Sequence, residues 1–319
     1  MIEKKKKKKR SFFSRYPKIG NLIYNFFGVM ILLAWLIGIP LFLILPRTLM
    51  YPLAKIIALK LVFPKIRKNT IKNLNYAFDR KLSKKRLEAI SKKVAINSVW
   101  SILDTIYLYT QWWHMNMKKF VVEVKGNEII MEAFKLKNGR IAGAAHYNCF
   151  ELQPVFFNDA YGHEESKNAV VARTIPNKFL RWLSYKAREL NGVETLFNDI
   201  KGVIRHLRQN RSVGILPDLF AKKDIGYPVN FFGKPTMSFD IHFRVASLTN
   251  SVIIPSLMMR RKQKPWTYYV QIYDFIKIKP KATHEEIMEK VQELNNVFEY
   301  HFRRFPGGWV WFHNKWRIL

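Results

Sequence analysis

The pattern of apolar and polar positions divides the chain into stretches of different character. Residues 19–46 contain no charged side chain, and a helix needs about 20 apolar residues to cross a bilayer core, so a membrane anchor is predicted there. Residues 51–78 alternate apolar and basic side chains at near-helical spacing. Beside an anchor, this spacing favours an interfacial helix over an ordinary amphipathic core helix. A further helix is predicted over 82–109, with Ser83 as its N-cap.

From residue 119 onward, short apolar runs alternate with amphipathic helical segments. The predicted strands are 120–126, 140–146, 168–173, 212–218, 252–261 and 267–278. The predicted helices are 128–136, 178–192, 199–210, 240–250 and 283–305. Residues 224–237 are interpreted as a loop, and Thr283 and Glu286 have the spacing of a capping box. This alternation indicates an α/β fold with a mixed central sheet flanked by helices.

The chain is therefore expected to have four parts: a basic tail (1–18), a membrane anchor helix (19–46), an interfacial and helical region (47–118) and an α/β catalytic domain (119–319). A cleaved signal peptide is the alternative for the second part. Its apolar region is typically only about 7–15 residues long and ends in small residues, whereas this one ends in "LFLILPRTLM". Basic residues flank both sides of the anchor, so their distribution leaves spanning and re-entrant arrangements open.

Charge is the unusual feature of the composition. Lys and Arg number 55 against 23 Asp and Glu, which gives a net charge of +32 and implies an anionic partner such as phospholipid, nucleic acid or an acidic protein. No nucleic-acid-binding motif is present, so nucleic acid is not an expected partner. The single cysteine, Cys149, excludes an internal disulfide and a multi-cysteine zinc site. We predict neither a metal nor a cofactor.

Three polar residues, His146, Arg173 and Asp218, lie at the ends of predicted strands, where α/β sheets usually bind their ligands. A neutral histidine can accept a proton from a hydroxyl, and a nearby carboxylate such as Glu151 can stabilise the resulting imidazolium. Five positions along one helix separate two side chains by about 140°, so His146 and Glu151 pair only with His146 in a loop and Glu151 in the first helical turn. Alternatively, Glu151 forms a capping box with Asn148, and His146 is structural.

Five segments, taken in order, resemble a known family. They are the H-x4-E motif "HYNCFE", "VVARTIPNKFLRWLSYKARELNG", "DIKGVIRHLRQNRSVGILPD", "VNFFGKPTMSFDIHFRVASLTNSVIIP" and "FPGGWVWFHNKWR". Together they are similar to the bacterial late acyltransferases of lipid A biosynthesis, the lauroyl/myristoyl transferase family. The resemblance implies a glycerolipid-acyltransferase-like fold behind a membrane anchor. Leu219 departs from the family pattern, which commonly has a polar residue after the Pro-Asp pair.

The resemblance also implies a reaction. An acyl chain would pass from acyl carrier protein to a hydroxyl of a phosphorylated glycolipid, the lipid A precursor, at the cytoplasmic face of the inner membrane. His146 would be the general base and Glu151 its partner, and substrate-binding roles would fall to Arg173, Asn177, Arg188 and Asp218. Membrane phospholipid would be a further partner. The alternatives are transfer to another glycolipid or lysophospholipid, and a non-catalytic membrane-tethered protein that binds lipid or nucleic acid.

Overall fold

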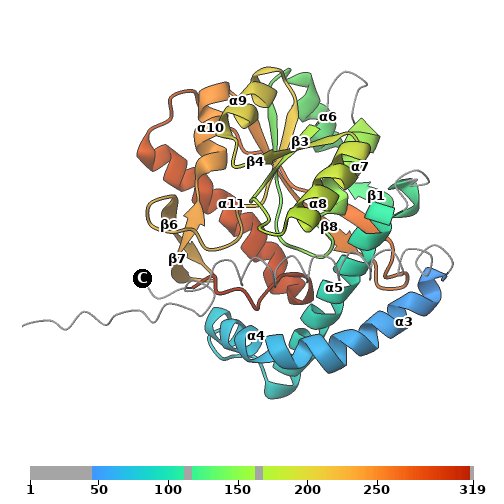
Figure 1. The fold of residues 1–319 in the computed structure, drawn as a ribbon. Helices are drawn as coiled ribbons and strands as arrows, with labels where there is room; N and C mark the ends of the chain where they lie inside the picture. The colour runs from blue at the N-terminus through green and yellow to red at the C-terminus, as the bar shows by residue number, and fades with distance from the viewer. Residues whose placement is uncertain (1–44, 111–116, 162–167, 317–319) are drawn as a thin grey trace, which may run out of the picture.

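The computed structural model describes residues 45–110, 117–161 and 168–316, which form an α/β fold with a helical layer at one end (Figure 1). The predicted basic tail, 1–18, and all but the last two residues of the predicted anchor, 19–46, lie outside the described residues. Within the described ranges, no helix is long and apolar enough to cross a bilayer.

The central sheet has seven strands in the order β1-β9-β8-β2-β5-β3-β4, and all neighbours pair in parallel except β8 and β9. The strands are β1 (Val121–Lys125), β2 (Arg140–Gly143), β3 (Asn168–Ala172), β4 (Val193–Phe197), β5 (Ser212–Ile215), β8 (Val252–Arg260) and β9 (Tyr268–Ile272). β8 is buried at every position but its last, because helices cover both faces of the sheet. The prediction of an α/β fold with a mixed sheet is confirmed.

Helices cover both faces of this sheet, with α9, α10 and α11 on one face and α6 and α7 on the other (Figure 1). Their bounds are α6 (Asn127–Lys135), α7 (Leu152–Tyr161), α8 (Lys178–Leu190), α9 (Ile200–Arg208), α10 (Ile241–Thr249) and α11 (His284–Arg304). α8 packs beside β4, the edge strand. The predicted capping box at the start of α11 is present, since Thr283 and Glu286 each accept the other's backbone N–H.

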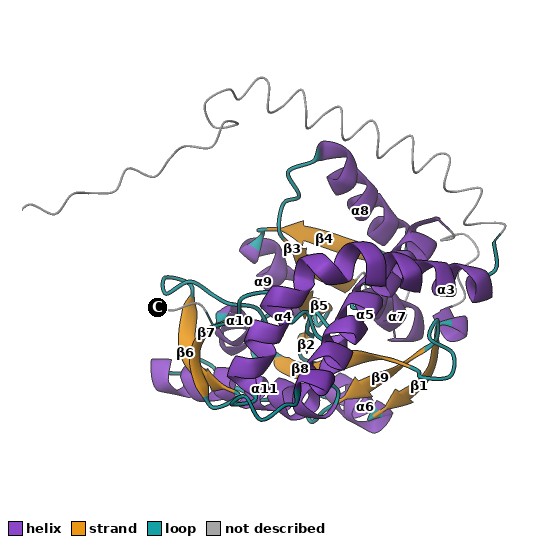
Figure 2. Ribbon diagram, turned by 90° about the horizontal axis from the view of Figure 1, so that it is seen from below, coloured by secondary structure: helices purple, strands orange, loops and turns teal. Residues whose placement is uncertain are grey.

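The remaining helices form a layer that crosses one end of the sheet, as Figure 2 shows from below. They are α3 (Arg47–Ile57), a π-helical turn (Ala58–Val62), α4 (Phe63–Ala77) and α5 (Lys84–Thr110). Ser83 accepts the backbone N–H of Arg86, as expected of the N-cap of α5. The layer is tied to the sheet by buried Asp104 of α5, whose carboxylate accepts hydrogen bonds from the three side chains Tyr51, Arg260 and Tyr268.

The prediction of a loop over residues 224–237 is wrong, because these residues lie in an antiparallel hairpin of β6 (Gly226–Phe231) and β7 (Lys234–Phe239). The two-residue turn places Phe232 and Gly233 at positive φ, 58° and 67°, the conformation that tight hairpins require. Pro228 and Pro235 suggested a loop, but a two-stranded ribbon has unpaired outer edges where proline is tolerated.

The predicted strand over 267–278 is also shorter than expected. Its continuous ladder with β8 ends at Ser256 and Ile272, next to Pro255, which has no N–H to donate. Pairing resumes only as an isolated antiparallel bridge between Ile253 and Ile276.

Candidate active site

His146 and Asp218 lie side by side because two adjacent parallel strands end in register. β2 pairs with β5 so that Gly143 lies opposite Ile215, and His146 and Asp218 each follow three residues later. His146 lies in the loop between β2 and α7, three residues beyond the end of β2, whereas the predicted strand ran to His146 itself. Asp218 leaves the sheet at the same edge, where the carboxyl ends of the parallel strands open towards the helical layer (Figure 1).

The Asp218 carboxylate is fully buried and holds His146 by two contacts. Its Oδ1 lies 2.8 Å from the Nδ1 of His146, and its Oδ2 accepts the His146 backbone N–H at 3.0 Å. The indole Nε1 of Trp309 donates to the same Oδ2 at 2.8 Å. Since the carboxylate is ionised, Nδ1 carries a proton, which leaves Nε2 as the basic nitrogen. The His146 side chain is 24% exposed, so this site combines a fixed tautomer with access from outside.

Burial and the partner's charge shift the pKa values of His146 and Asp218 in opposite directions. Burial of His146 favours the neutral ring, yet the charge and hydrogen bond of Asp218 outweigh it, so the pKa of His146 lies above its ordinary value of 6.5. Glu151 adds to this rise and Arg173 opposes it. Burial likewise disfavours the Asp218 anion, but its bonds to His146 and Trp309 hold the pKa of Asp218 below the ordinary value. The pair is thus arranged to accept a proton and to stabilise the imidazolium.

The Glu151 carboxylate is hydrogen-bonded to Arg188 and not to His146, the partner expected from the sequence. Glu151 lies in the turn just before α7, and both its carboxylate oxygens accept hydrogen bonds from the guanidinium of Arg188, the shortest at 2.8 Å. This bidentate pair fixes the carboxylate, so its influence on His146 is electrostatic. The capping-box alternative is also not seen, because the Oδ1 of Asn148, which would accept the capping hydrogen bond, has no partner among the described residues.

The other predicted substrate-binding residues have different surroundings. Arg173 follows β3, is exposed, and has no ion pair among the described residues. Asn177 is buried directly before α8, where its carbonyl accepts the N–H of Arg181. Arg188 is buried against Glu151 and not a solvated surface charge. Asp218 is buried and hydrogen-bonds to His146 and Trp309, and its predicted role in substrate binding stays a prediction.

A narrow apolar cavity of about 100 Å³ runs beside the site, between α7 and the sheet. Ala142 of β2 and Gly214 of β5 line it, as do Glu151, Arg188 and Phe150, whose ring contacts the ring of His146. It continues to Phe134, Tyr161 and Arg140 at the opposite edge of the sheet. The Arg140 guanidinium lies 4.3 Å from the Phe134 ring centroid, and burial lowers its pKa to about 10. Strands rise about 3.3 Å per residue, so the cavity extends for roughly 13 Å along β2.

Two features of the site are not predicted from the sequence: the cavity, and the hydrogen bond from Trp309, which stands in the fifth family-like segment. Within the described ranges, no group of three or more His, Cys, Asp or Glu side chains is placed to hold a metal ion.

The chain is similar to one protein family and to a solved structure. The profile of the bacterial lipid A biosynthesis acyltransferase family matches residues 20–318. Among solved structures, the 1-acyl-sn-glycerophosphate (LPA) acyltransferase PlsC from Thermotoga maritima is similar, with 15% identity and a TM-score of 0.37; the match covers 81% of this chain and 99% of that chain. No curated protein matches significantly.

Proposed function

Because the chain belongs to the bacterial lipid A biosynthesis acyltransferase family, we propose that it moves a fatty acyl chain from an acyl carrier protein thioester to a hydroxyl of a lipid A precursor. The observation that carries this proposal is the His146–Asp218 pair beside an apolar cavity. This arrangement combines a general base with a binding site for a hydrocarbon chain, and acyl transfer from a lipid-like donor requires both.

The reaction follows from the free Nε2 of His146. This nitrogen removes the proton of the acceptor hydroxyl as its oxygen attacks the thioester carbonyl carbon. Asp218 stabilises the imidazolium that forms. When the tetrahedral intermediate collapses, the C–S bond breaks and the imidazolium returns the proton to the departing thiolate. An ester and the free thiol of the carrier protein are the products.

Charge stabilisation at the carbonyl oxygen needs donors aimed at it. The backbone N–H groups of His146 and Asn148 were obvious candidates, but they already donate to Asp218 and to the Gly308 carbonyl. Arg173 is the cation that we assign to the developing charge or to an acceptor phosphate, because it is exposed and electrostatically coupled to His146. Glu151 and Arg188 then line the cavity, held in place by their ion pair.

The donor and acceptor account for the strong positive charge. Acyl carrier protein is acidic and lipid A precursors carry phosphates, so a net charge of +32 attracts both. In this proposal residues 19–46 anchor the chain in the inner membrane, and the catalytic domain, 119–319, faces the cytoplasm, where the carrier protein is found.

The direct test of the function is a product assay. Membranes containing the full chain are incubated with acyl carrier proteins bearing different chains and with a tetra-acylated lipid A precursor, and the product is weighed by mass spectrometry. We expect the precursor to gain the mass of one acyl chain. If it gains nothing while a lysophospholipid or another glycolipid is acylated, the acceptor assignment is wrong; if no lipid is acylated, the enzymatic assignment fails.

Narrowing the cavity should change the preferred donor. Ala142 lines the cavity midway along β2, so Ala142→Leu is expected to lower kcat/KM for long-chain donors relative to short-chain donors by roughly tenfold or more. The control is Val213→Leu, which adds bulk to the opposite face of the sheet. Competition between two acyl carrier proteins in one reaction measures the ratio. Equal losses for both donors in Ala142→Leu would show that the acyl chain lies elsewhere.

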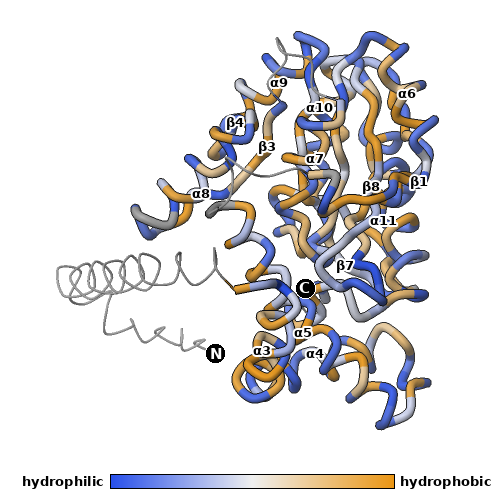
Figure 3. The backbone as a smooth tube through the Cα atoms, turned by 90° about the vertical axis from the view of Figure 1, so that its right-hand side faces the viewer, coloured by the Kyte–Doolittle hydropathy of each residue, from blue (hydrophilic) through white to orange (hydrophobic). Residues whose placement is uncertain are grey.

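An exposed apolar face on the helical layer supports contact with lipid. Leu49, Leu53, Ile56 and Leu61 are each more than half exposed and recur at helical spacing along α3 and the π-helical turn. The opposite face of the same helix is buried, and Lys55 and Lys60 lie exposed beside the apolar stripe. Figure 3 shows α3 at the same end of the molecule as α4 and α5. We assign this face to an anionic phospholipid surface, which takes up both the apolar and the basic side chains.

A fluorescent probe tests this assignment. An environment-sensitive dye attached to Leu53→Cys in the full chain should shift to shorter wavelength when vesicles containing anionic phospholipid are added, because the native Cys149 is buried. The same dye at Ile225→Cys, on an exposed loop, serves as the control. A blue-shifted spectrum before lipid is added would mean that another part of the chain covers the face. An unchanged spectrum would mean that the face stays in water.

A further inference from the structure

Residues 305–316, which follow α11, pack against the loop that carries His146 and against Asp218. We call this segment the C-terminal strap. The backbones of Tyr147 and Trp309 form an antiparallel bridge, and the N–H of Asn148 donates to the Gly308 carbonyl at 2.9 Å. The strap is therefore hydrogen-bonded to the two residues that follow His146 in the chain. On its other side it reaches Asp218 through Trp309.

We propose that Trp309 is a positioning residue of the acyl transfer, acting through Asp218. Its indole N–H and the backbone N–H of His146 occupy the same oxygen, Oδ2. With Oδ2 held at both contacts, the carboxylate cannot rotate, and Oδ1 remains directed at Nδ1 of His146. The inference rests on the proposed function and extends it, because it makes the end of the chain part of the catalytic site.

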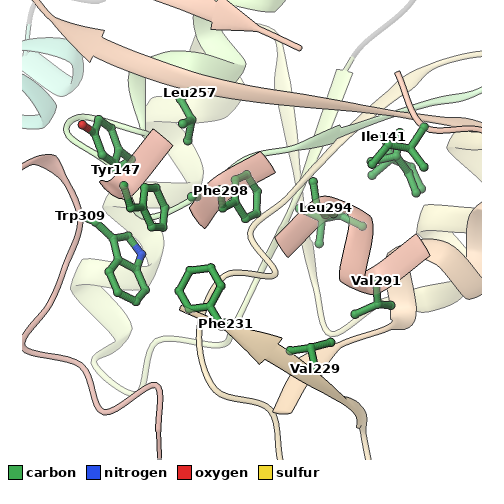
Figure 4. Packing of buried hydrophobic residues seen from close by; sticks show 14 of the residues in the cluster. Ile141, Tyr147, Val229, Phe231, Leu257, Val291, Leu294, Phe298 and Trp309 are labelled. Atoms are coloured by element: carbon green, nitrogen blue, oxygen red, sulfur yellow. The ribbon is translucent and has the colours of Figure 1, made fainter. Parts of the chain in front are cut away.

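Packing fixes the indole itself. Trp309 is 1% exposed and stacks on Phe302 of α11 with ring centroids 4.9 Å apart. It also contacts Phe231 of the hairpin and lies in the same buried cluster as Tyr147 (Figure 4). A side chain held on several sides has few alternative rotamers, so its N–H is directed at Asp218 before substrate arrives.

The strap packs so closely against Tyr147 that Gly308 has no space for a side chain. A β-carbon added there would lie 2.3 Å from the ring of Tyr147, the neighbour of His146. Lys315 completes the strap: its buried ammonium donates to the carbonyl of Leu219, directly after Asp218, and burial lowers its pKa to about 7. Lys315, Glu151 and Arg173 are the charged groups coupled electrostatically to the His146–Asp218 pair.

The test compares two tryptophans of the strap. Trp309→Phe removes the donor to Asp218, whereas Trp311→Phe removes a donor that binds only the Pro306 carbonyl. Because a hydrogen bond to a charged group is comparatively strong, we expect kcat to fall by roughly tenfold to a hundredfold in Trp309→Phe. Because a loosened Asp218 stabilises the imidazolium less, the acid limb of the pH–rate profile should move to lower pH. Trp311→Phe should keep the wild-type midpoint.

The midpoint of the pH profile does not depend on how much folded enzyme is present, so it separates positioning from stability. If Trp309→Phe does not fold, Trp309→Met, which fills the space with a flexible side chain and also lacks the donor, takes its place. Equal midpoints in Trp309→Phe, Trp311→Phe and the wild type would overturn the proposal. Asp218→Asn, which removes the carboxylate itself, is measured in the same assay; if it also leaves the rate and the midpoint unchanged, the proposed function is wrong instead.

Discussion

Replacing His146 with alanine is expected to lower the rate of acyl transfer by roughly a hundredfold to ten-thousandfold, the usual contribution of a positioned general base. Without the imidazole, no group in contact with Asp218 can accept the proton of the acceptor hydroxyl. Binding of the full chain to membranes should not change, since the loop after β2 is remote from the predicted anchor in sequence. The measurement is the initial rate of acylation of the precursor at saturating donor.

Two further variants separate loss of the base from loss of structure. His146→Gln keeps an amide donor for Asp218 but offers no basic nitrogen, so it should be as inactive as the alanine variant. His242→Leu removes another buried histidine, whose two ring nitrogens have no hydrogen-bond partner among the described residues. This control should retain the wild-type rate, because the burial that lowers its pKa to about 3 keeps it neutral and out of proton transfer. A wild-type rate in His146→Ala would exclude the proposed mechanism.

The sequence predicted the ends of the strands better than it predicted the contacts between them. His146 and Asp218 were both predicted at the ends of strands, and the parallel register of β2 and β5 brings them together. Their separation of 72 residues hid this contact, whereas Glu151, five residues from His146, looked like the natural partner. Strand order and register decide which strand ends are neighbours, and no local pattern in a single sequence indicates this order or register.

The remaining corrections have the same cause. Arg188 lies in a helix rich in basic residues, which is typical of a solvated surface, yet it is buried because Glu151 lies opposite it, 37 residues away. Trp309 donates to an oxygen that is 91 residues away in the chain. Local signals did succeed where the physics is local: the capping box of α11 and the N-cap of α5 formed as predicted. Long-range polar partners therefore require the fold.

The pH dependence of Asp218→Asn is the second large effect that the site predicts. In the wild type the pKa of His146 lies above 6.5, so the rate should rise with pH through a midpoint above 6.5 as the imidazole becomes neutral. Asparagine keeps the shape of the side chain but removes the negative charge. The imidazolium then loses its main stabilisation, burial dominates, and the pKa of His146 falls. The acid limb of the variant should lie at lower pH.

The maximal rate of Asp218→Asn should nevertheless fall by roughly a hundredfold or more, because the imidazolium that forms during the reaction is no longer stabilised and an amide can select the wrong tautomer. The two changes have opposite signs at low pH: the variant keeps a larger fraction of its own maximum while being slower in absolute terms. Asp240→Asn is the matched control, a buried carboxylate that accepts from Arg244 at 2.6 Å. It should keep the wild-type midpoint. A midpoint that moves to higher pH in Asp218→Asn would mean that Asp218 does not stabilise the protonated His146.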